Sequence, residues 1–228
     1  VVSELPGSSI AESFRNLPSN LFLKYRTEPL NVIMVTSSQP MDGKSFVSFN
    51  LAAAIASVGH KSVLVDCDLR RPTLHEKFNA DNSNGLSRYM VNHTSKDEII
   101  LKTGVKNLAF IPSGPILPNS SELIEAGVLD ELINHLKNKY EYVIIDATPT
   151  GLVADAIPLI KYATHILLVC RNNHTRKDVF GDVLTMFRTN KIDNFDVVFN
   201  DLNLKGSRYG RYDAYYKKDK TSLIPKLV

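Results

Sequence analysis

The sequence predicts a doubly wound α/β domain, in which a mostly parallel sheet carries helices on both faces. Between residue 31 and about residue 200, short continuous apolar runs alternate with segments of helical periodicity, which is typical of parallel strands buried on both faces. A Gly-Lys-Ser triplet at residues 43–45 stands between the first apolar run and the first helical segment. The 228 residues are 43% hydrophobic and 22% charged, which suits a soluble globular domain.

The apolar and helical patterns place the elements along the chain. Six strands are expected at residues 32–36, 62–66, 108–111, 142–146, 165–170 and 196–199, because each is a short apolar run. Helices are expected at about 44–58, 119–138 and 175–189, with shorter helical patterns at 86–90 and 96–101. Right-handed βαβ connections then bring the carboxyl ends of the strands to one edge of the sheet, where ligands bind in such folds.

The first 30 residues are expected to form a separate helical segment. Apolar residues at positions 10, 14, 17, 21 and 22 share one face of a helix. Pro18 lies within this pattern and should kink or split the helix, because proline lacks the N–H that a helix interior needs. A main domain would follow over residues 31–204, and a tail over residues 205–228.

A candidate phosphate loop follows the first expected strand. The pattern G-x-x-x-x-G-K-[ST] of P-loop NTPases is met by Gly43, Lys44 and Ser45, while Ser38 stands at the first glycine position. In such a loop the backbone N–H groups cradle phosphates, the lysine reaches the β- and γ-phosphates, and the hydroxyl ligates Mg²⁺. An ordinary turn before a helix is the alternative for this element alone. The candidate nucleotide-binding residues of the loop are Ser38, Gln39, Pro40, Met41, Asp42, Gly43, Lys44, Ser45 and Phe46.

Two expected strands end in carboxylates. The strand at 142–146 ends in Asp146, which matches the Walker-B position that holds Mg²⁺ directly or through water. The strand at 62–66 runs into Asp66-Cys67-Asp68-Leu69-Arg70, whose two carboxylates could ligate a metal and accept a proton from an attacking hydroxyl. Each carboxylate could instead cap the turn or helix that follows it. Lys44, Asp66, Asp68 and Asp146 are the catalytic candidates, and Ser45, Asp68 and Asp146 are the candidate metal ligands.

The C-terminal tail differs from the rest of the chain in charge and aromatic content. Residues 205–228 carry seven Lys or Arg and two Asp or Glu, a net charge of +5, whereas the whole chain carries +3. Four of the nine tyrosines lie here, with Gly, Arg, Asp and Lys between them, so the segment cannot easily bury one face. We expect a flexible tail that offers phenolic hydroxyls, those of Tyr209, Tyr212, Tyr215 and Tyr216.

In combination these motifs resemble the bacterial tyrosine autokinases (BY-kinases) of capsule and exopolysaccharide export systems. The resemblance rests on the phosphate loop, the D-x-D-x-R segment after a strand, Asp146 and the tyrosine tail. Residues 118–123 are similar to the P-N-P-x-E-L stretch of the family, and Glu12-Ser13-Phe14-Arg15 to the first half of its E-x-x-R-x-x-R oligomerisation motif. The resemblance covers nearly the whole chain.

The resemblance implies a protein-tyrosine kinase that uses ATP and Mg²⁺. Asp66 would accept the proton of the incoming tyrosine, and Asp68 and Asp146 would organise the metal. The four tail tyrosines would be the phosphoacceptors, in a neighbouring subunit. Asn200 stands where relatives contact adenine, although a residue that caps a turn is an equal alternative. Glu12 and Arg15 would serve oligomerisation.

Partners and location are also implied by the resemblance. They are further copies of the chain, which could close into a ring, a membrane-embedded polysaccharide co-polymerase or activator segment, and a tyrosine phosphatase. The expected location is the cytoplasmic face of the bacterial inner membrane. The sequence has no run of about 20 apolar residues, so we expect this chain itself to be soluble. It carries no recognised nucleic-acid module, and we expect no nucleic-acid partner.

Two departures from the family pattern leave alternatives open. Met41 stands where the family has glycine, so the loop either adopts a conformation open to an L-residue or binds phosphate poorly, as in a pseudokinase scaffold. Pro18 replaces the second arginine of the oligomerisation motif, which puts ring assembly in doubt. A P-loop switch ATPase of the partitioning or septum-positioning kind is the other alternative. Such proteins carry a lysine at the position of Gln39, which argues against it.

Overall fold

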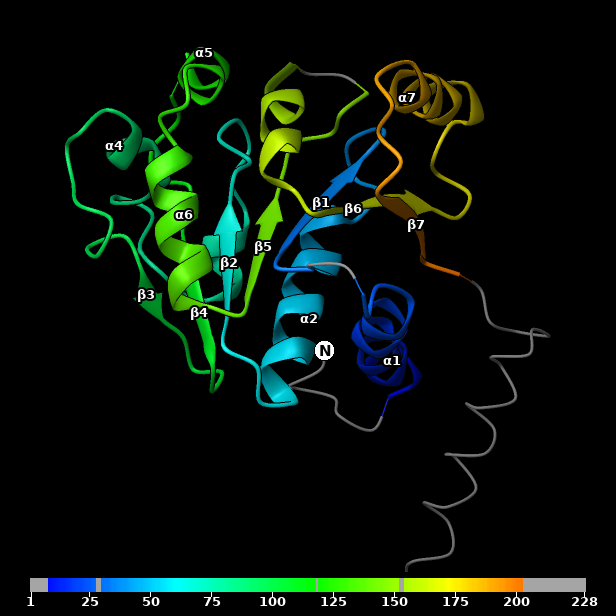
Figure 1. Ribbon diagram of the computed structural model, residues 1–228, viewed down its shortest axis with the longest axis horizontal. Helices are drawn as coiled ribbons and strands as arrows, with labels where there is room; N and C mark the ends of the chain where they lie inside the picture. The colour runs from blue at the N-terminus through cyan, green and yellow to red at the C-terminus, as the bar shows by residue number, and fades with distance from the viewer. Residues whose placement is uncertain (1–7, 28–29, 118, 152–153, 203–228) are drawn as a thin grey trace, which may run out of the picture.

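The computed structural model describes residues 8–27, 30–117, 119–151 and 154–202, in which seven strands form one sheet. The strand order is β3-β4-β2-β5-β1-β6-β7, and every neighbouring pair is parallel except β3 with β4. In Figure 1 the arrowheads of β1, β2 and β5 point to the same edge of the sheet. The doubly wound fold class is therefore confirmed. The strands are β1 (Val32–Ser37), β2 (Ser62–Asp66), β3 (Leu101–Lys102), β4 (Leu108–Ile111), β5 (Tyr142–Asp146), β6 (His165–Arg171) and β7 (Phe195–Asn200).

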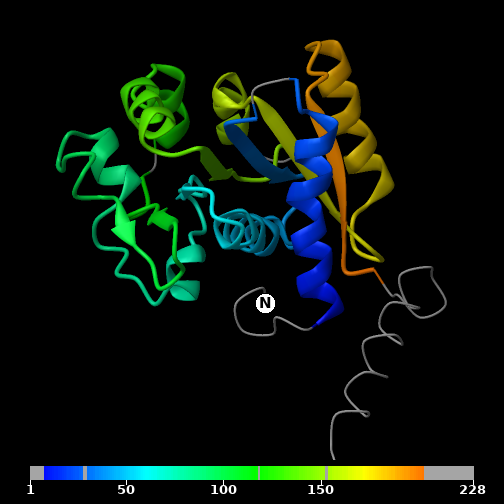
Figure 2. The same cartoon turned by 60° about the horizontal axis from the view of Figure 1, so that its bottom comes forward.

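Helices cover both faces of this sheet. Ile33 and Val35 of β1 pack with α1 and α2 on one face, whereas Val32 and Met34 face the cluster formed with α6, η1 and α7, because successive strand residues point to opposite faces. Figure 2 shows α2 on one side of the sheet and the helices between residues 120 and 162 on the other. The helices are α1 (Ser9–Lys24), α2 (Lys44–Ser57), α3 (Leu74–Lys77), α4 (Leu86–Met90), α5 (Ser120–Glu125), α6 (Asp130–Lys139), the 3₁₀ helix η1 (Ala154–Tyr162) and α7 (Lys177–Thr189).

The expected strand positions are confirmed to within one residue at either end, but several helix predictions are wrong. The helix expected at 119–138 is two helices, because Gly127 between them has φ +82°, which a helix cannot contain. The segment 96–101 forms turns and then β3, where its edge strand pairs with β4. The short elements α3, β3 and η1 were not expected from the sequence.

The helix α1 runs through Pro18 without a break, so the expectation of a split at this proline is wrong, whereas the other expected outcome, a kink, stays a prediction. Proline in a helix interior costs about 3 kcal/mol. Packing offsets this cost: Phe14 and Leu21 are buried against the sheet and α2, and Ser8 caps the helix by accepting a hydrogen bond from the Ala11 N–H at 3.1 Å. None of the helices in the described ranges has the length and apolar content that a membrane crossing requires.

Candidate active site

The phosphate loop connects β1 to α2 at the carboxyl edge of the sheet. Gly43 precedes the helix with φ +96°, and a Cβ atom at this position would lie 2.1 Å from the Asn200 amide nitrogen. No other residue fits there without displacing Asn200. Met41 takes φ +65°, the left-handed conformation that glycine adopts readily. The loop therefore keeps a glycine-like path at Met41, although an L-residue disfavours it by about 1–2 kcal/mol.

Lys44 faces two of the predicted carboxylates from the first turn of α2. Its Nζ lies 2.6 Å from Asp68 Oδ2 and 3.9 Å from Asp146 Oδ2, and it donates a hydrogen bond to Ser45 Oγ at 3.3 Å. Burial raises the pKa of Asp146, and the nearby Ser45 hydroxyl is among the groups that oppose this rise. Burial alone would lower the pKa of Lys44, but Asp146 and Asp68 outweigh burial and raise it, so the side chain is an ammonium ion. The three candidate metal ligands thus lie around the Lys44 ammonium ion.

Asp66 and Asp146 lie side by side at the ends of two neighbouring strands. They are partners in the β2–β5 register, and both are 0% exposed. Burial and then the like charge of Asp146 raise the pKa of Asp66 well above its usual value, and burial likewise raises the pKa of Asp146. Among the hydrogen bonds within the described chain, Asp66 Oδ2 and Asp146 Oδ2 find no donor. Two buried carboxylate oxygens are therefore available to a ligand.

The donor set suits Mg²⁺ held together with phosphates. Asp68, Asp146 and the Ser45 hydroxyl lie around the Lys44 ammonium ion, with Asp66 beside Asp146, so several oxygen atoms that could ligate a divalent cation are gathered in one place. Within the described ranges no three His, Cys, Asp or Glu side chains form a ready metal cage. Protein sites usually bind Mg²⁺ through one or two carboxylates, and water and phosphates supply its other ligands.

The structure brings most of the predicted site residues together and separates others. Lys44, Ser45 and the three aspartates meet at the edge of the sheet, and Asn200 Nδ2 donates to the Asp42 carbonyl at 2.9 Å. The Phe46 ring packs on Phe14 of α1, with centroids 5.4 Å apart, so only its backbone could serve a nucleotide.

The predicted oligomerisation pair lies within the described structure, whereas the predicted phosphoacceptors do not. Glu12 and Arg15 lie on α1 and form an ion pair with each other. The four tyrosines lie outside the described residues, so their role stays a prediction.

Sequence reasoning missed the side chains that hold the site from other segments. Ser48, one helical turn after Lys44, donates to Asp146 Oδ1 at 2.9 Å. Thr175, in the loop between β6 and α7, donates to Asp42 Oδ1 at 2.6 Å. The spacing of Ser48 within α2 could have indicated its direction. Nothing in the sequence links Thr175 to a residue so far before it.

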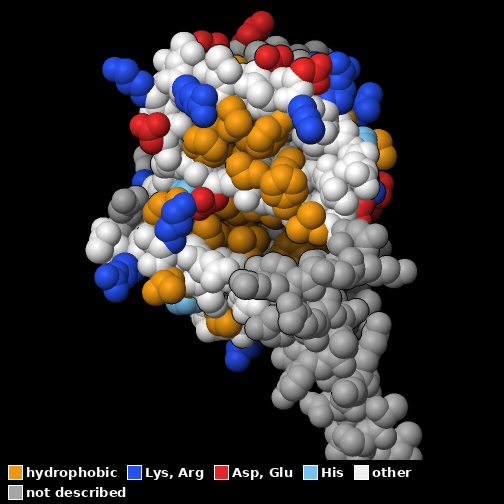
Figure 3. Space-filling model, turned by 90° about the vertical axis from the view of Figure 1, so that its right-hand side faces the viewer, with side chains coloured by type: hydrophobic (Ala, Val, Ile, Leu, Met, Phe, Trp, Pro, Cys, Tyr) orange, Lys and Arg blue, Asp and Glu red, His pale blue; other side chains and the backbone are white. Residues whose placement is uncertain are grey.

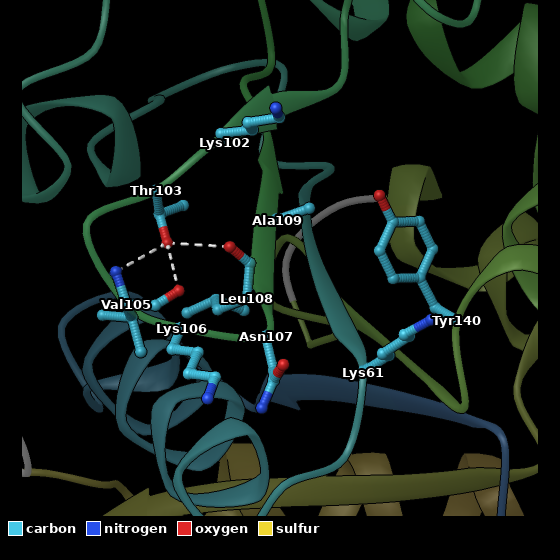
Figure 4. A pocket seen from close by; sticks show the side chains of 9 residues that line it. All are labelled: Lys61, Lys102, Thr103, Val105, Lys106, Asn107, Leu108, Ala109 and Tyr140. Atoms are coloured by element: carbon cyan, nitrogen blue, oxygen red, sulfur yellow. Dashed lines mark hydrogen bonds between the residues drawn. The ribbon is translucent and has the colours of Figure 1, made fainter.

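A hollow lies at the opposite end of the strands, away from the cluster around Lys44. It has a volume of about 320 Å³ and lies at the amino ends of β2, β4 and β5. Figure 4 shows its lining, in which Thr103 closes a turn by donating to the Leu108 carbonyl at 2.8 Å. Its charged lining residues are the exposed lysines Lys61, Lys102 and Lys106.

Comparisons of sequence match this chain to a family model and to named tyrosine-protein kinases. The family model described as "AAA domain" matches residues 30–177. The putative tyrosine-protein kinase CapB of Staphylococcus aureus is 34% identical over 168 residues, which cover 74% of each chain. Tyrosine-protein kinase YwqD of Bacillus subtilis strain 168 is 32% identical over 214 residues, which cover 94% of this chain and 90% of YwqD.

Comparisons of structure agree with those of sequence. The crystal structure of the chimerical protein CapA2B2 superposes with a TM-score of 0.84 at 34% identity, covering 88% of both chains. The kinase domain of Escherichia coli tyrosine kinase ETK gives a TM-score of 0.79 at 28% identity, covering 89% of this chain and 81% of that one. The septum site-determining protein MinD of Pyrococcus horikoshii, at 24% identity and a TM-score of 0.60, shares the fold alone.

The relatives differ in length. This chain spans most of CapB and YwqD, but it covers only 30% of tyrosine-protein kinase wzc of Salmonella typhimurium, to which it is 32% identical over 218 residues. The longer relatives therefore carry regions that have no counterpart in these 228 residues.

Proposed function

The chain belongs to the bacterial tyrosine kinases of the P-loop type, and on that premise we propose that it transfers the γ-phosphoryl group of ATP to tyrosines in its own C-terminal tail. One observation supports this most strongly: Lys44 lies 2.6 Å from Asp68 and 3.9 Å from Asp146 at the carboxyl edge of the sheet. Phosphoryl transfer asks little covalent chemistry of a protein and depends on cations and acceptors held in position.

The residues of the site have separate roles in this proposal. The loop N–H groups and Lys44 bind the β- and γ-phosphates, and the Lys44 ammonium stabilises charge on the transferring group. Ser45, Asp68 and Asp146 would hold Mg²⁺, which would supply positive charge against the phosphate oxygens. Ser48 orients Asp146 through its 2.9 Å hydrogen bond. Asn200, at the end of β7, holds the loop by its hydrogen bond to the Asp42 carbonyl, and it could in addition contact the adenine of ATP.

Asp66 is the proposed acceptor for the tyrosine proton. Free tyrosine has a pKa of about 10, so a neighbouring base helps in the transition state. Burial raises the pKa of Asp66, which makes its carboxylate a stronger base when it is ionised. Its Oδ2 has no donor within the described chain, so a hydroxyl group can use it.

The proposed acceptors are Tyr209, Tyr212, Tyr215 and Tyr216 of a neighbouring subunit. The last described residues follow Asn200, whose side chain donates to the Asp42 carbonyl of the phosphate loop, so the described part of the chain ends close to the site. A mixture of two variants tests the direction of transfer. A Lys44→Met chain with an intact tail should become phosphorylated when mixed with an active chain that ends at residue 204. The opposite result has two parts: an active monomeric chain phosphorylates its own tail, and the Lys44→Met chain in the mixture gains no phosphate. That result would show transfer within one chain.

The proposed homo-oligomer would use the side of the molecule that carries α1 and β7. Figure 3 shows apolar side chains gathered on this side. Val197 and Phe199 of the edge strand β7 are 39% and 62% exposed, beside a groove of about 220 Å³ that Leu17 and Leu21 of α1 help to line. Glu12 and Arg15 lie on the same helix, α1. Sedimentation should show assembly that Phe199→Ser weakens; unchanged assembly in that variant would exclude this face.

The wider role proposed is regulation of capsular or exopolysaccharide export at the cytoplasmic face of the inner membrane. The name of one relative supports it, the putative tyrosine-protein kinase in the cps region of Klebsiella pneumoniae. A membrane-embedded activator segment and a tyrosine phosphatase would then control the phosphorylation level. Loss of surface polysaccharide in a Lys44→Met strain would test this role, and wild-type polysaccharide in that strain would contradict it.

A further inference from the structure

A buried carboxylate lies inside the phosphate loop and takes no part in the proposed chemistry. Asp42 is 0% exposed, although it belongs to a loop between a strand and a helix. Its Oδ2 accepts hydrogen bonds from the Gln39 N–H at 3.3 Å and from the Ser38 hydroxyl at 3.4 Å. The carboxylate thus ties the two ends of the loop's first turn together. A buried charge needs strong hydrogen-bond partners. The partner of the other Asp42 carboxylate oxygen, Oδ1, therefore matters.

The remaining oxygen of Asp42 is held from a distant segment. Thr175 donates to Asp42 Oδ1 at 2.6 Å, shorter than either bond to Oδ2. Thr175 is fixed in turn, because its Oγ1 accepts the Arg171 N–H at 2.6 Å and its own N–H donates to the Arg171 carbonyl at 3.0 Å. The carboxylate is therefore anchored to the end of β6, the strand that pairs with β1.

The same segment also holds the loop backbone around Met41. The His174 ring lies 3.1 Å from the Pro40 carbonyl, and Arg171 Nη1 donates to the Met41 carbonyl at 3.3 Å. Gln39 exchanges hydrogen bonds with the His174 carbonyl and the Arg176 N–H, at 3.2 and 3.1 Å. These contacts surround the one loop position where an L-residue has a positive φ, and where glycine would adopt the conformation more readily.

We propose that Thr175 is a positioning residue of the phosphate loop. Its hydroxyl holds the Asp42 carboxylate, and Asp42 holds residues 38–42 in the nucleotide-binding conformation that Met41 by itself disfavours. The inference rests on the proposed function, because it assigns a role within the same nucleotide site. It explains how this chain can keep a working loop without the usual glycine.

Population arithmetic gives the expected size of the effect. Apparent affinity falls in proportion to the fraction of molecules whose loop is formed. Thr175→Val keeps the shape of the side chain but removes the donor, and we expect it to weaken binding of ATP with Mg²⁺ about tenfold, which corresponds to about 1.4 kcal/mol. Because it acts on loop formation, it should raise KM far more than it lowers kcat. Thr175→Ser restores the hydroxyl and should bind nearly as the wild type does.

A second variant distinguishes loop positioning from general stability. With Met41→Gly the loop is formed more readily, so the same loss of the Thr175 hydroxyl should weaken binding only about twofold. The experiment is calorimetric titration of ATP and Mg²⁺ into the four chains of this cycle, with thermal melting of each. Thr185→Val is the matched control, because Thr185 donates to the Gly181 carbonyl at 2.9 Å within α7.

The outcomes separate this inference from the proposed function. Non-additive loss of binding in the cycle, with recovery in Thr175→Ser and none lost in the control, supports the positioning role. A Thr175→Val chain that binds ATP as tightly as the wild type overturns the inference and leaves the proposed function intact. Losses that are equal with and without the Met41→Gly substitution also overturn it. A folded wild-type chain that binds no ATP overturns both.

Discussion

The two ends of the same parallel strands carry charge in different ways. At the carboxyl ends, Asp66 and Asp146 are 0% exposed and the Lys44 side chain is only 12% exposed. At the amino ends, charged side chains surround a hollow of about 320 Å³ and remain in solvent; they are Lys61, Lys102 and Lys106. Exposed charge costs little, whereas buried charge costs several kcal/mol per ion unless partners compensate for it.

The difference shows which cluster of charges the fold keeps buried despite the free-energy cost of burying charge. At the buried end the Lys44 ammonium ion faces two carboxylates with a third, Asp66, beside Asp146, and two carboxylate oxygens have no donor within the described chain. A cluster kept only for stability would pair its charges or replace them with apolar side chains. Perturbed pKa values in such a place are typical of functional sites. Substitutions should therefore affect activity strongly at one end of the strands and little at the other.

The strongest contrast should come from the two lysines. Lys44→Met should lower tyrosine phosphorylation about 10³-fold or more, the size associated with losing a cation that stabilises a transferring phosphoryl group. Lys61→Met makes the same change at the exposed end and should leave the rate within about twofold. Initial rates of phosphotyrosine formation measure both. Comparable losses in the two variants would remove the contrast.

An intermediate effect is expected for Asp66→Asn. The variant should lose about 10²–10⁴-fold in phosphoryl transfer, the usual contribution of a general base, and should still bind ATP. Its Tm should rise, because a buried carboxylate beside Asp146 is gone, by about 2–4 °C for each kcal/mol gained. Asp97→Asn, at an exposed side chain, is the control. A variant with full activity would exclude Asp66 as the base.

A pH dependence of stability should be the weakest of these effects. Burial raises the pKa of Asp66 in the folded chain, so the folded state holds a proton that the unfolded state releases. Stability should therefore fall as pH rises from the usual range of an aspartate through the raised pKa. Subtracting the Asp66→Asn melting curve isolates this contribution in the nucleotide-free protein. A difference that grows in favour of the wild type with rising pH would have the wrong sign.

The sequence predicted the elements and residues whose pattern is local. Every main strand, the phosphate loop and the carboxylates after β2 and β5 could be located, because apolar runs and short motifs carry their own signal. The edge strand β3 is two residues long and has no such signal. The break at Gly127 was missed because helical periodicity continues on both sides of it.

Contacts between distant segments were out of reach. Thr175 and Asp42 are 133 positions apart, and only the packing of β6 beside β1 brings them together. The left-handed conformation of Met41 likewise depends on its neighbours in space, since the sequence left open whether the loop adopts a conformation open to an L-residue or binds phosphate poorly. Pro18 gave the opposite error, because packing of α1 outweighed a local preference that the sequence shows clearly.

Phosphoryl transfer to tyrosine by the buried cluster around Lys44 can be observed by intact-mass spectrometry after incubation with ATP and Mg²⁺, in the presence of an activator segment. We expect added phosphates on the wild-type chain, located by peptide mapping mostly at residues 209–216, and none on Lys44→Met. A wild-type chain that stays unmodified, or a Lys44→Met chain that gains the same phosphates alone, would refute the assignment of this chemistry to the cluster.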